Sequence, residues 1–199
     1  MSYMNIQPVT LTGKYVRLEP ISLAHVADLT PHAMDPGIWF FMPYGPIDTQ
    51  ERVRWWVEEM LRRQSAGNDL PFATIDLASG KAIGATRFMD IHRQDRNVEI
   101  GGSWLGVAHR RTAANTEAKY LQLTHAFETW GCIRVQIKTD VRNERSQRAI
   151  ERLGAVKEGV IRKNMIMPDG YQRSSVYYSI LDDEWPAIKA RLEGILQAS

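Results

Sequence analysis

Two adjacent arginines that lead into a helix form the part of this sequence best suited to hold an anion. The segment VEIGGSWLG is followed by a short basic loop, His109-Arg110-Arg111-Thr112, and then by a run of helix-forming residues up to Gly131. The first N–H groups of a helix lack backbone partners, and the helix dipole favours a negative charge beside them. A phosphate site is one interpretation; a solvated basic loop that caps a packing helix is the other. The phosphate interpretation involves Arg110, Arg111, Thr112, Ala113, Ala114, Asn115 and Thr116.

The strand-like segment that precedes this loop carries a carboxylate beside small residues. Gly101 and Gly102 are adjacent in it, and glycine inside a strand usually marks a bulge or a close approach by another group. Strand alternation places Glu99 on the same face as Gly101 and Ser103. Its carboxylate therefore borders space and could accept a proton, directly or through water. An exposed glutamate or an ion-pair partner is the alternative interpretation.

A third candidate lies on a short helix that follows the alternating segment CIRVQIKT. Ser146 precedes Ala149, Ile150 and Leu153 by three, four and seven residues. It therefore shares the buried face of this helix, where a hydroxyl needs a partner. Asn143 stands at the helix start, where it can act as a cap. The plain alternative is that Asn143 only caps and that Ser146 bonds back to its own helix.

An aromatic segment, IWFFMPY at positions 38–44, is broken by Pro43 and followed by Gly45. We expect a loop whose rings must be covered. They could pack in the core or against another subunit, or they could form the wall of a substrate pocket. The candidate wall residues are Trp39, Phe40, Phe41 and Tyr44.

Composition limits the class of protein. The 199 residues contain no repeat or linker, so we treat 1–199 as a single domain. With 44% hydrophobic and 24% charged residues the chain resembles an ordinary soluble protein. The net charge of +2 argues against a nucleic-acid partner. No signal peptide or membrane-spanning run is evident, so we expect a cytoplasmic protein. The single cysteine and the scattered histidines predict no disulfide and no metal site.

The elements that position these residues alternate in a recognisable order. The pattern predicts β-α-α-β-β-β-α-β-α-β-β-α, with a helix after the cap Asp48. This is a mixed α/β sheet of about seven strands, mostly antiparallel, with one βαβ crossover and helices on its faces. Pro168-Asp169-Gly170 predicts the turn of the last hairpin. The predicted strands are 15–19, 71–77, 82–91, 97–105, 132–139, 156–167 and 174–181.

This order and two motifs resemble the GCN5-related N-acetyltransferase (GNAT) superfamily, and within it the RimJ/RimL-type branch. The motifs are residues 110–118, RRTAANTEA, and 140–155, DVRNERSQRAIERLGA. The second is the more specific, with its Asn, a Ser three residues later and a Leu-Gly beyond. The family's phosphate loop is Gln/Arg-x-x-Gly-x-Gly/Ala. Arg110 matches its first position, whereas Ala113 stands where Gly is usual and Asn115 where Gly or Ala is usual.

The resemblance implies a reaction and roles. Acetyl-CoA would donate its acetyl group to a primary amine, a protein N-terminus or a small amine, by direct attack in a ternary complex. A bulge would splay a central strand pair and admit the pantetheine arm, with backbone N–H groups near Leu105 polarising the thioester. Glu99 would accept the proton, Asn143 would contact the cofactor, and Ser146 would help to bind the cofactor and to protonate the thiolate. Relatives often form homodimers, and many use a tyrosine as the acid; Tyr177 and Tyr178 are candidates for that role.

Two rival classes remain open. A non-catalytic CoA-binding or regulatory module of the same fold would fit the changes at Ala113 and Asn115. An RNA-binding protein could use a basic stripe on the short helix, although a net charge of +2 gives little long-range attraction. The stripe consists of Arg142, Arg145, Arg148 and Arg152.

Overall fold

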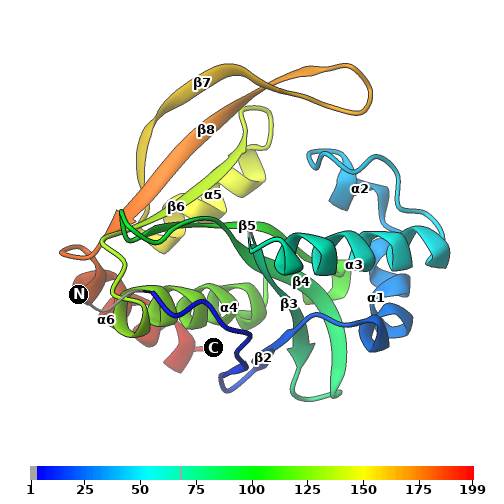
Figure 1. Cartoon of the computed structure of the whole chain (residues 1–199). Helices are drawn as coiled ribbons and strands as arrows, with labels where there is room; N and C mark the ends of the chain where they lie inside the picture. Colours follow the sequence, from blue (N-terminus) through cyan, green and yellow to red (C-terminus); the bar gives the residue numbers. More distant parts are fainter. Residues whose placement is uncertain (1–3, 68) are drawn as a thin grey trace.

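The structure is a computed structural model that describes residues 4–67 and 69–199. It contains an eight-stranded sheet in the order β1-β2-β3-β4-β5-β6-β8-β7 (Figure 1). Neighbouring strands are antiparallel except β5 and β6, which are parallel. The predicted mixed, mostly antiparallel sheet is confirmed, and the two-residue β1 is additional. The strands are β1 Leu11–Thr12, β2 Val16–Pro20, β3 Asp69–Asp76, β4 Lys81–His92, β5 Asn97–Leu105, β6 Arg134–Asp140, β7 Val156–Ile166 and β8 Gln172–Leu181.

Both faces of the sheet are covered, as the alternation along β3 shows. Leu70 and Phe72 belong to one core cluster together with Leu123 of α4. Ala73 and Ile75 belong to a second cluster on the side of α1 and α3. Neighbouring side chains of a strand point to opposite faces, so β3 contributes to both cores. The helices are α1 Val26–Ala33, α2 Pro36–Trp39, α3 Gln50–Ser65, α4 Ala113–Thr124, α5 Glu144–Leu153 and α6 Trp185–Gln197, with short turns η1 Leu23–His25, η2 Val107–His109 and the π-helical η3 His125–Thr129.

Two helices differ in detail from the sequence-based prediction. The cap of α3 is Thr49, whose side chain accepts a hydrogen bond from the N–H of Arg52 at 3.2 Å, so the prediction of Asp48 is wrong by one residue. Adjacent Asp and Thr can both cap, and spacing alone does not separate them. The long central helix becomes π-helical from His125 and is followed by Gly131, whose φ is +65°.

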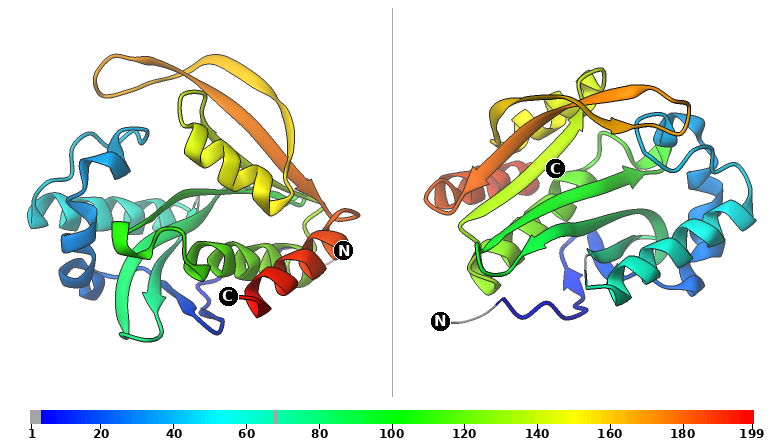
Figure 2. Two further views of the ribbon diagram at one scale, coloured as in Figure 1. Left: turned by 180° about the vertical axis from the view of Figure 1, so that it is seen from behind. Right: turned by 45° about the horizontal axis from the view of Figure 1, so that its top comes forward.

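The parallel pair β5 and β6 is splayed, as predicted. The two strands pair only where Asn97 to Glu99 lie opposite Arg134 to Gln136, and beyond that point they separate. The two strands can be followed from this contact in Figure 2. The β4–β5 register also shifts between Ala85 and Arg87, opposite Gly102. Gly102 has φ +59°, a conformation that glycine adopts at no steric cost. The adjacent glycines of β5 therefore form the bulge that opens the sheet.

The hairpin of β7 and β8 extends over α5 toward the segment that contains α2 (Figure 1). Its turn is the predicted Pro168-Asp169-Gly170, with Gly170 at φ +84°. Arg173 of β8 donates a hydrogen bond to the carbonyl of Phe41 at 2.9 Å. The hairpin and the aromatic segment therefore meet above the splayed strands.

Candidate active site

A cavity of about 870 Å³ opens at the splay between β5 and β6. Its walls come from β5, β6, the start of α4, one face of α5, the aromatic segment and the β7–β8 hairpin. Its size is typical of small-molecule sites, and its walls combine apolar residues with many charged and polar groups. Most of the predicted site residues line it: Phe41, Tyr44, Glu99, Leu105, Arg110, Arg111, Thr112, Asn115, Asn143 and Ser146.

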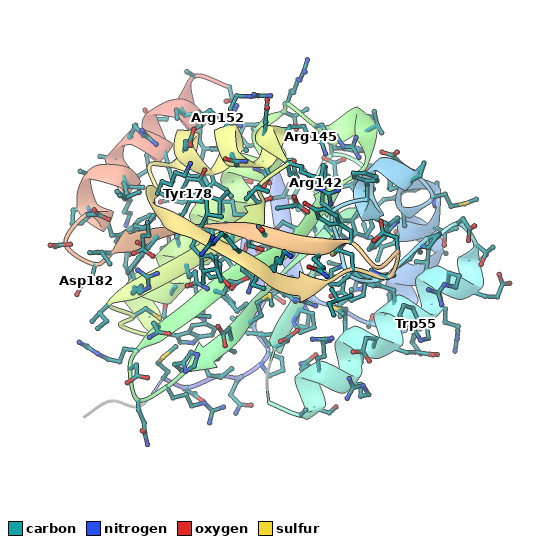
Figure 3. The ribbon with its side chains drawn as sticks, turned by 90° about the horizontal axis from the view of Figure 1, so that it is seen from above. Trp55, Arg142, Arg145, Arg152, Tyr178 and Asp182 are labelled. Atoms are coloured by element: carbon teal, nitrogen blue, oxygen red, sulfur yellow. The ribbon has the colours of Figure 1, made fainter. Side chains whose placement is uncertain are left out.

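One end of the cavity is rich in arginine. Arg111, Arg145 and Arg152 line it with exposed side chains, and none makes an ion pair within the residues that the structure describes. Arg145 and Arg152 project from α5 (Figure 3). Arg110 is held differently: its guanidinium donates to Leu105 O at 3.2 Å and to Asp35 Oδ2 at 2.6 Å. This end of the cavity can hold an anionic group on three free guanidinium groups.

The start of α4 faces the same end. Thr112 is its cap, and its hydroxyl oxygen accepts a hydrogen bond from the N–H of Ala114 at 3.2 Å. The side chains of Ala113, Ala114 and Thr116 do not line the cavity, so their contribution would come from the backbone. In the loop that leads into α4, Arg111 has a positive φ of +63°, whereas Ala113 does not. Ala113, where the family has glycine, therefore needs no left-handed backbone.

Glu99 is a buried carboxylate with one oxygen occupied. It is 2% exposed, and its Oε2 accepts hydrogen bonds from Lys138 Nζ and Gln136 Nε2, both at 2.8 Å. The ion-pair interpretation is therefore correct for one oxygen. The other oxygen, Oε1, makes no hydrogen bond within the described residues and lies 3.1 Å from the position that a Cβ on Gly101 would take. Glu99 can thus accept a proton in the cavity while Lys138 holds it in place.

Asn143 and Ser146 lie together at the start of α5. Asn143 Oδ1 caps the helix by accepting a hydrogen bond from the N–H of Ser146 at 3.1 Å. Ser146 Oγ makes no hydrogen bond to another described residue, so the bond back to its own helix, which was the alternative interpretation, is not formed. Both residues line the cavity. The amide NH2 of Asn143 and the hydroxyl of Ser146 are therefore available to a bound molecule.

The tyrosine candidates lie outside the cavity lining. Tyr178 is fully buried, and its hydroxyl donates a hydrogen bond to Glu151 Oε1 at 3.0 Å. Burial and this carboxylate raise the pKa of Tyr178 to about 12. A tyrosine that is held in this way does not readily give a proton to a group in the cavity.

The aromatic segment is divided between core, surface and cavity. Trp39 is 4% exposed and donates its indole N–H to Ala33 O at 2.5 Å, and its ring packs edge-on against Trp56. Phe40 is 62% exposed, and its ring faces the guanidinium of Arg142. Trp39 and Phe40 are absent from the cavity lining, unlike Phe41 and Tyr44. Trp39 is therefore a core residue, and Phe40 a surface one.

Sequence reasoning missed a lysine in the cavity wall. Lys119 is 5% exposed, and its ammonium donates to Thr86 Oγ1 at 2.9 Å, Ser103 Oγ at 2.6 Å and Gln122 Oε1 at 3.0 Å. These partners are neutral, and burial lowers the pKa of Lys119 to about 7. The available signal was its spacing, four residues after Asn115 on α4, which places both on one helix face. Arg87, Lys138 and Arg173 line the cavity as well and were also missed.

Other groups show no reactive environment. Cys132 is 1% exposed, and burial raises the pKa of its thiol to about 12. Across residues 4–67 and 69–199 no group of three or more His, Cys, Asp or Glu side chains could hold a metal ion. No helix in this part of the chain is long and apolar enough to cross a membrane.

Known proteins that resemble this chain are acetyltransferases of one family. Residues 16–156 match the family model described as an acetyltransferase (GNAT) domain. A Bacillus subtilis (strain 168) protein named provisionally as the ribosomal N-acetyltransferase YdaF is 30% identical over 173 residues, which are 86% of this chain and 92% of that protein. A GCN5-related N-acetyltransferase from Brucella melitensis is 31% identical, with TM-score 0.89 and coverage of 96% of this chain and 86% of that chain. Mycobacterium smegmatis RimJ, solved with CoA-disulfide, shares the fold at 18% identity, with TM-score 0.80 and coverage of 94% and 95%.

Proposed function

The chain belongs to the GNAT acetyltransferase family, and from this premise we propose that it transfers the acetyl group of acetyl-CoA to a primary amine by direct attack in a ternary complex. The observation that carries the proposal is the continuous cavity. It leads from the free arginines at the start of α4 and on α5 to the buried carboxylate of Glu99. A nucleotide thioester and an amine could meet in it at the splay.

The arginine-rich end suits the phosphates of the cofactor. Arg111, Arg145 and Arg152 supply charge, and the N–H groups from Thr112 to Thr116 supply directed donors at a helix start. Ala113 and Asn115 do not adopt positive φ, so the chain keeps a helical first turn in which those N–H groups point outward. Acetyl-CoA would bind here as a co-substrate.

The splay suits the pantetheine arm. Beyond Glu99 the backbone of β5 has no partner strand on its β6 side, and an extended chain can bond to such an edge. The thioester carbonyl would then lie near Leu105, where a backbone N–H group stabilises the developing oxyanion. The amide of Asn143 would hold the arm from the opposite wall.

Proton transfer falls to two residues. Glu99 Oε1 would accept the proton of the attacking amine, directly or through water, because it has no other partner within the described chain. Ser146 Oγ, also without a partner, would donate toward the departing thiolate. The bonds balance: the amine nitrogen loses a proton to Glu99 and gains the acetyl carbon, the carbon–sulfur bond breaks, and the sulfur takes the Ser146 proton, so CoA leaves as the thiol. Ser146 then regains a proton, and Glu99 releases one, through water.

The acceptor we propose is a protein N-terminus or a small amine. The name of the Bacillus subtilis relative, a ribosomal N-acetyltransferase, favours the protein N-terminus. The aromatic segment and the β7–β8 hairpin both contribute residues to the cavity wall, so the end of an extended chain could lie against them.

Release of CoA thiol in the presence of peptides with free N-termini tests this function. We expect turnover by the wild type and a fall in kcat of about a hundredfold or more for Glu99→Gln, which keeps the shape of the side chain but cannot accept the proton. Ser146→Ala should lower kcat by a smaller factor, because water can replace a hydroxyl. Binding of acetyl-CoA without turnover on any acceptor would instead support a non-catalytic CoA-binding module.

A further inference from the structure

The cavity has a strong excess of positive charge beyond the group that faces the phosphates. Nine lysine and arginine side chains line it, against one carboxylate, Glu99. Five of the nine lie at the arginine-rich end, on the loop before α4 and on α5. The remaining four, Arg87, Lys119, Lys138 and Arg173, come from the walls near the splay and beneath the hairpin. Phosphate binding does not account for them.

Three of these four cations have a partner that explains their burial. Arg87 lies 3.3 Å from Asp69 Oδ2. Lys138 lies 2.8 Å from Glu99 Oε2. Lys119 is surrounded by neutral oxygen acceptors, and its lowered pKa allows it to lose its charge near neutral pH.

Arg173 is the exception. It is 6% exposed, its Nε donates to Ser175 Oγ at 3.0 Å, and its Nη1 donates to Phe41 O at 2.9 Å. Within the described residues it has no carboxylate within 4.0 Å and no acceptor for Nη2. A guanidinium stays protonated at any working pH. A buried charge without a counter-ion is costly, so it is normally paired or reserved for a ligand.

The two carboxylates that act electrostatically on Arg173, Asp140 and Glu99, each have another cation as ion-pair partner. Glu99 is held by Lys138. Asp140 is 0% exposed, and its two oxygens accept hydrogen bonds from Arg142 Nε at 3.1 Å and Nη2 at 2.9 Å. The side chains around Arg173 therefore leave one positive charge uncompensated inside the cavity.

Arg173 also lies in the part of the cavity that the acceptor would occupy. It connects β8 to the aromatic segment through Phe41, and it shares the cavity wall with Glu99, the proposed base. An amine that approaches Glu99 would thus place its neighbouring groups near this guanidinium. The planar fork of arginine matches the two oxygens of a carboxylate.

We propose that the acceptor carries a carboxylate close to its amine and that Arg173 binds this carboxylate and selects for it. This inference rests on the proposed acetyl transfer and names its substrate class. One uncompensated positive charge matches the single negative charge of a carboxylate. A phosphate monoester, with a charge of about −1.5 to −2 near pH 7, would leave excess negative charge facing Glu99. The carboxylate could belong to a free amino acid or to an acidic side chain beside a peptide N-terminus.

Matched pairs of acceptors test the proposal. One arm compares amino acids with their amides; the other compares peptides with Asp or Glu at the second or third position with the same peptides carrying Asn or Gln. We expect the wild type to prefer the carboxylate member in one arm by roughly tenfold to a hundredfold in kcat/KM, the range for a hydrogen-bonded charged group. The arm that shows the preference identifies the source of the carboxylate.

Variants assign the preference to Arg173. In Arg173→Gln the ratio within each pair should fall to near unity while acetyl-CoA affinity is unchanged, and Arg173→Lys should keep part of the preference. Arg54→Gln, an exposed arginine of α3, is the matched control and should retain the wild-type ratio. A ratio that survives in Arg173→Gln would overturn the proposal.

The wild-type comparison needs no variant and so does not depend on folding of Arg173→Gln. Equal kcat/KM for both members in both arms overturns the proposal while leaving acetyl transfer intact. If no acceptor is turned over, the same pairs are titrated into the CoA-saturated protein. Tighter binding of the carboxylate member then supports the charge preference separately from catalysis, and equal binding overturns it.

Discussion

Single residues in this cavity gain their properties from what surrounds them. Lys138 and Gln136 hold Glu99 through its Oε2 oxygen, which leaves the Oε1 oxygen available to accept a proton. Lys119 has only neutral partners, so burial dominates its pKa. Neither property follows from residue type, because each depends on groups from other strands.

Replacement of Lys119 by methionine should change how stability depends on pH. The pKa of Lys119 is about 7 in the folded chain and about 10.4 in an unfolded one. Between these values the unfolded chain binds the extra proton, so the free energy of unfolding of the wild type rises with pH. Below pH 7 the cost of a buried charge is fully present, and above about pH 10 it is absent.

Urea unfolding at neutral pH and near pH 10 measures this effect. The stability of Lys119→Met relative to the wild type should be greater at neutral pH than at the higher pH, by up to ~4 kcal/mol. Any constant cost of leaving Thr86 and Ser103 without their donor cancels in this comparison. Parallel pH curves for the two proteins would show that Lys119 keeps an ordinary pKa.

At the scale of elements, the sequence predicted much of the framework but less of the site. The alternation of β6 and the apolar face of α5 follow from local periodicity, so both elements and the position of Ser146 were predicted. Arg173 and Lys119 were missed because their significance comes from contacts between segments distant in sequence. Trp39 was a candidate for both the core and the pocket wall, because a run of aromatic residues does not reveal which ring points inward. Local sequence patterns predict a helix or strand and which of its faces is buried. The residues that form the site depend in addition on which elements pack against one another.

Arg142 connects three elements around the acceptor end. Its guanidinium lies 3.5 Å from the ring centre of Tyr171, 5.5 Å from that of Phe40 and 5.7 Å from that of Phe41, and Asp140 fixes its direction. Figure 3 shows Arg142 between the hairpin and the segment of α2. Cation–π contacts contribute about 0.5–2 kcal/mol.

Arg142→Gln should therefore loosen the hairpin against the aromatic segment. We expect KM for the acceptor to rise by roughly twofold to thirtyfold, with acetyl-CoA affinity unchanged. Steady-state kinetics at saturating acetyl-CoA measures this, and Arg54→Gln on an exposed face of α3 is the control for lost charge. An equal change in both variants would point to charge rather than to the contact between elements.

Glu117 of α4 holds the start of β2. Its carboxylate accepts hydrogen bonds from the N–H groups of Lys14, Tyr15 and Val16, each at 2.7 Å. Glu117→Gln replaces one acceptor oxygen by a donor and leaves at least one part-buried N–H without a partner. We predict a loss of about 1–3 kcal/mol in the free energy of unfolding, measured by urea denaturation, with little change in acetyl-CoA affinity. Unchanged stability would mean that water satisfies these N–H groups.

At the scale of the whole molecule, net charge and local charge differ. The chain carries only +2 overall, yet the splay of β5 and β6 gathers nine basic side chains around one cavity. A cleft lined by one sign of charge attracts ligands of the opposite sign. Of the basic stripe that could have been an RNA-binding surface, Arg145, Arg148 and Arg152 lie on α5 and line the cavity, which favours an anionic cofactor instead. Arg142 precedes α5 and pairs with Asp140, so the predicted stripe is not continuous on one helix.

Calorimetric titration with acetyl-CoA tests the central claim most directly. Arg111→Ala/Arg145→Ala removes two free guanidinium groups from the cavity, and Arg54→Ala/Arg62→Ala removes two exposed ones from α3 as the matched control. We predict that the wild type binds acetyl-CoA, that the cavity variant binds it at least about tenfold more weakly, and that the control binds it as the wild type does. Absence of binding by the wild type at millimolar acetyl-CoA, or an equal loss in both variants, would contradict the account.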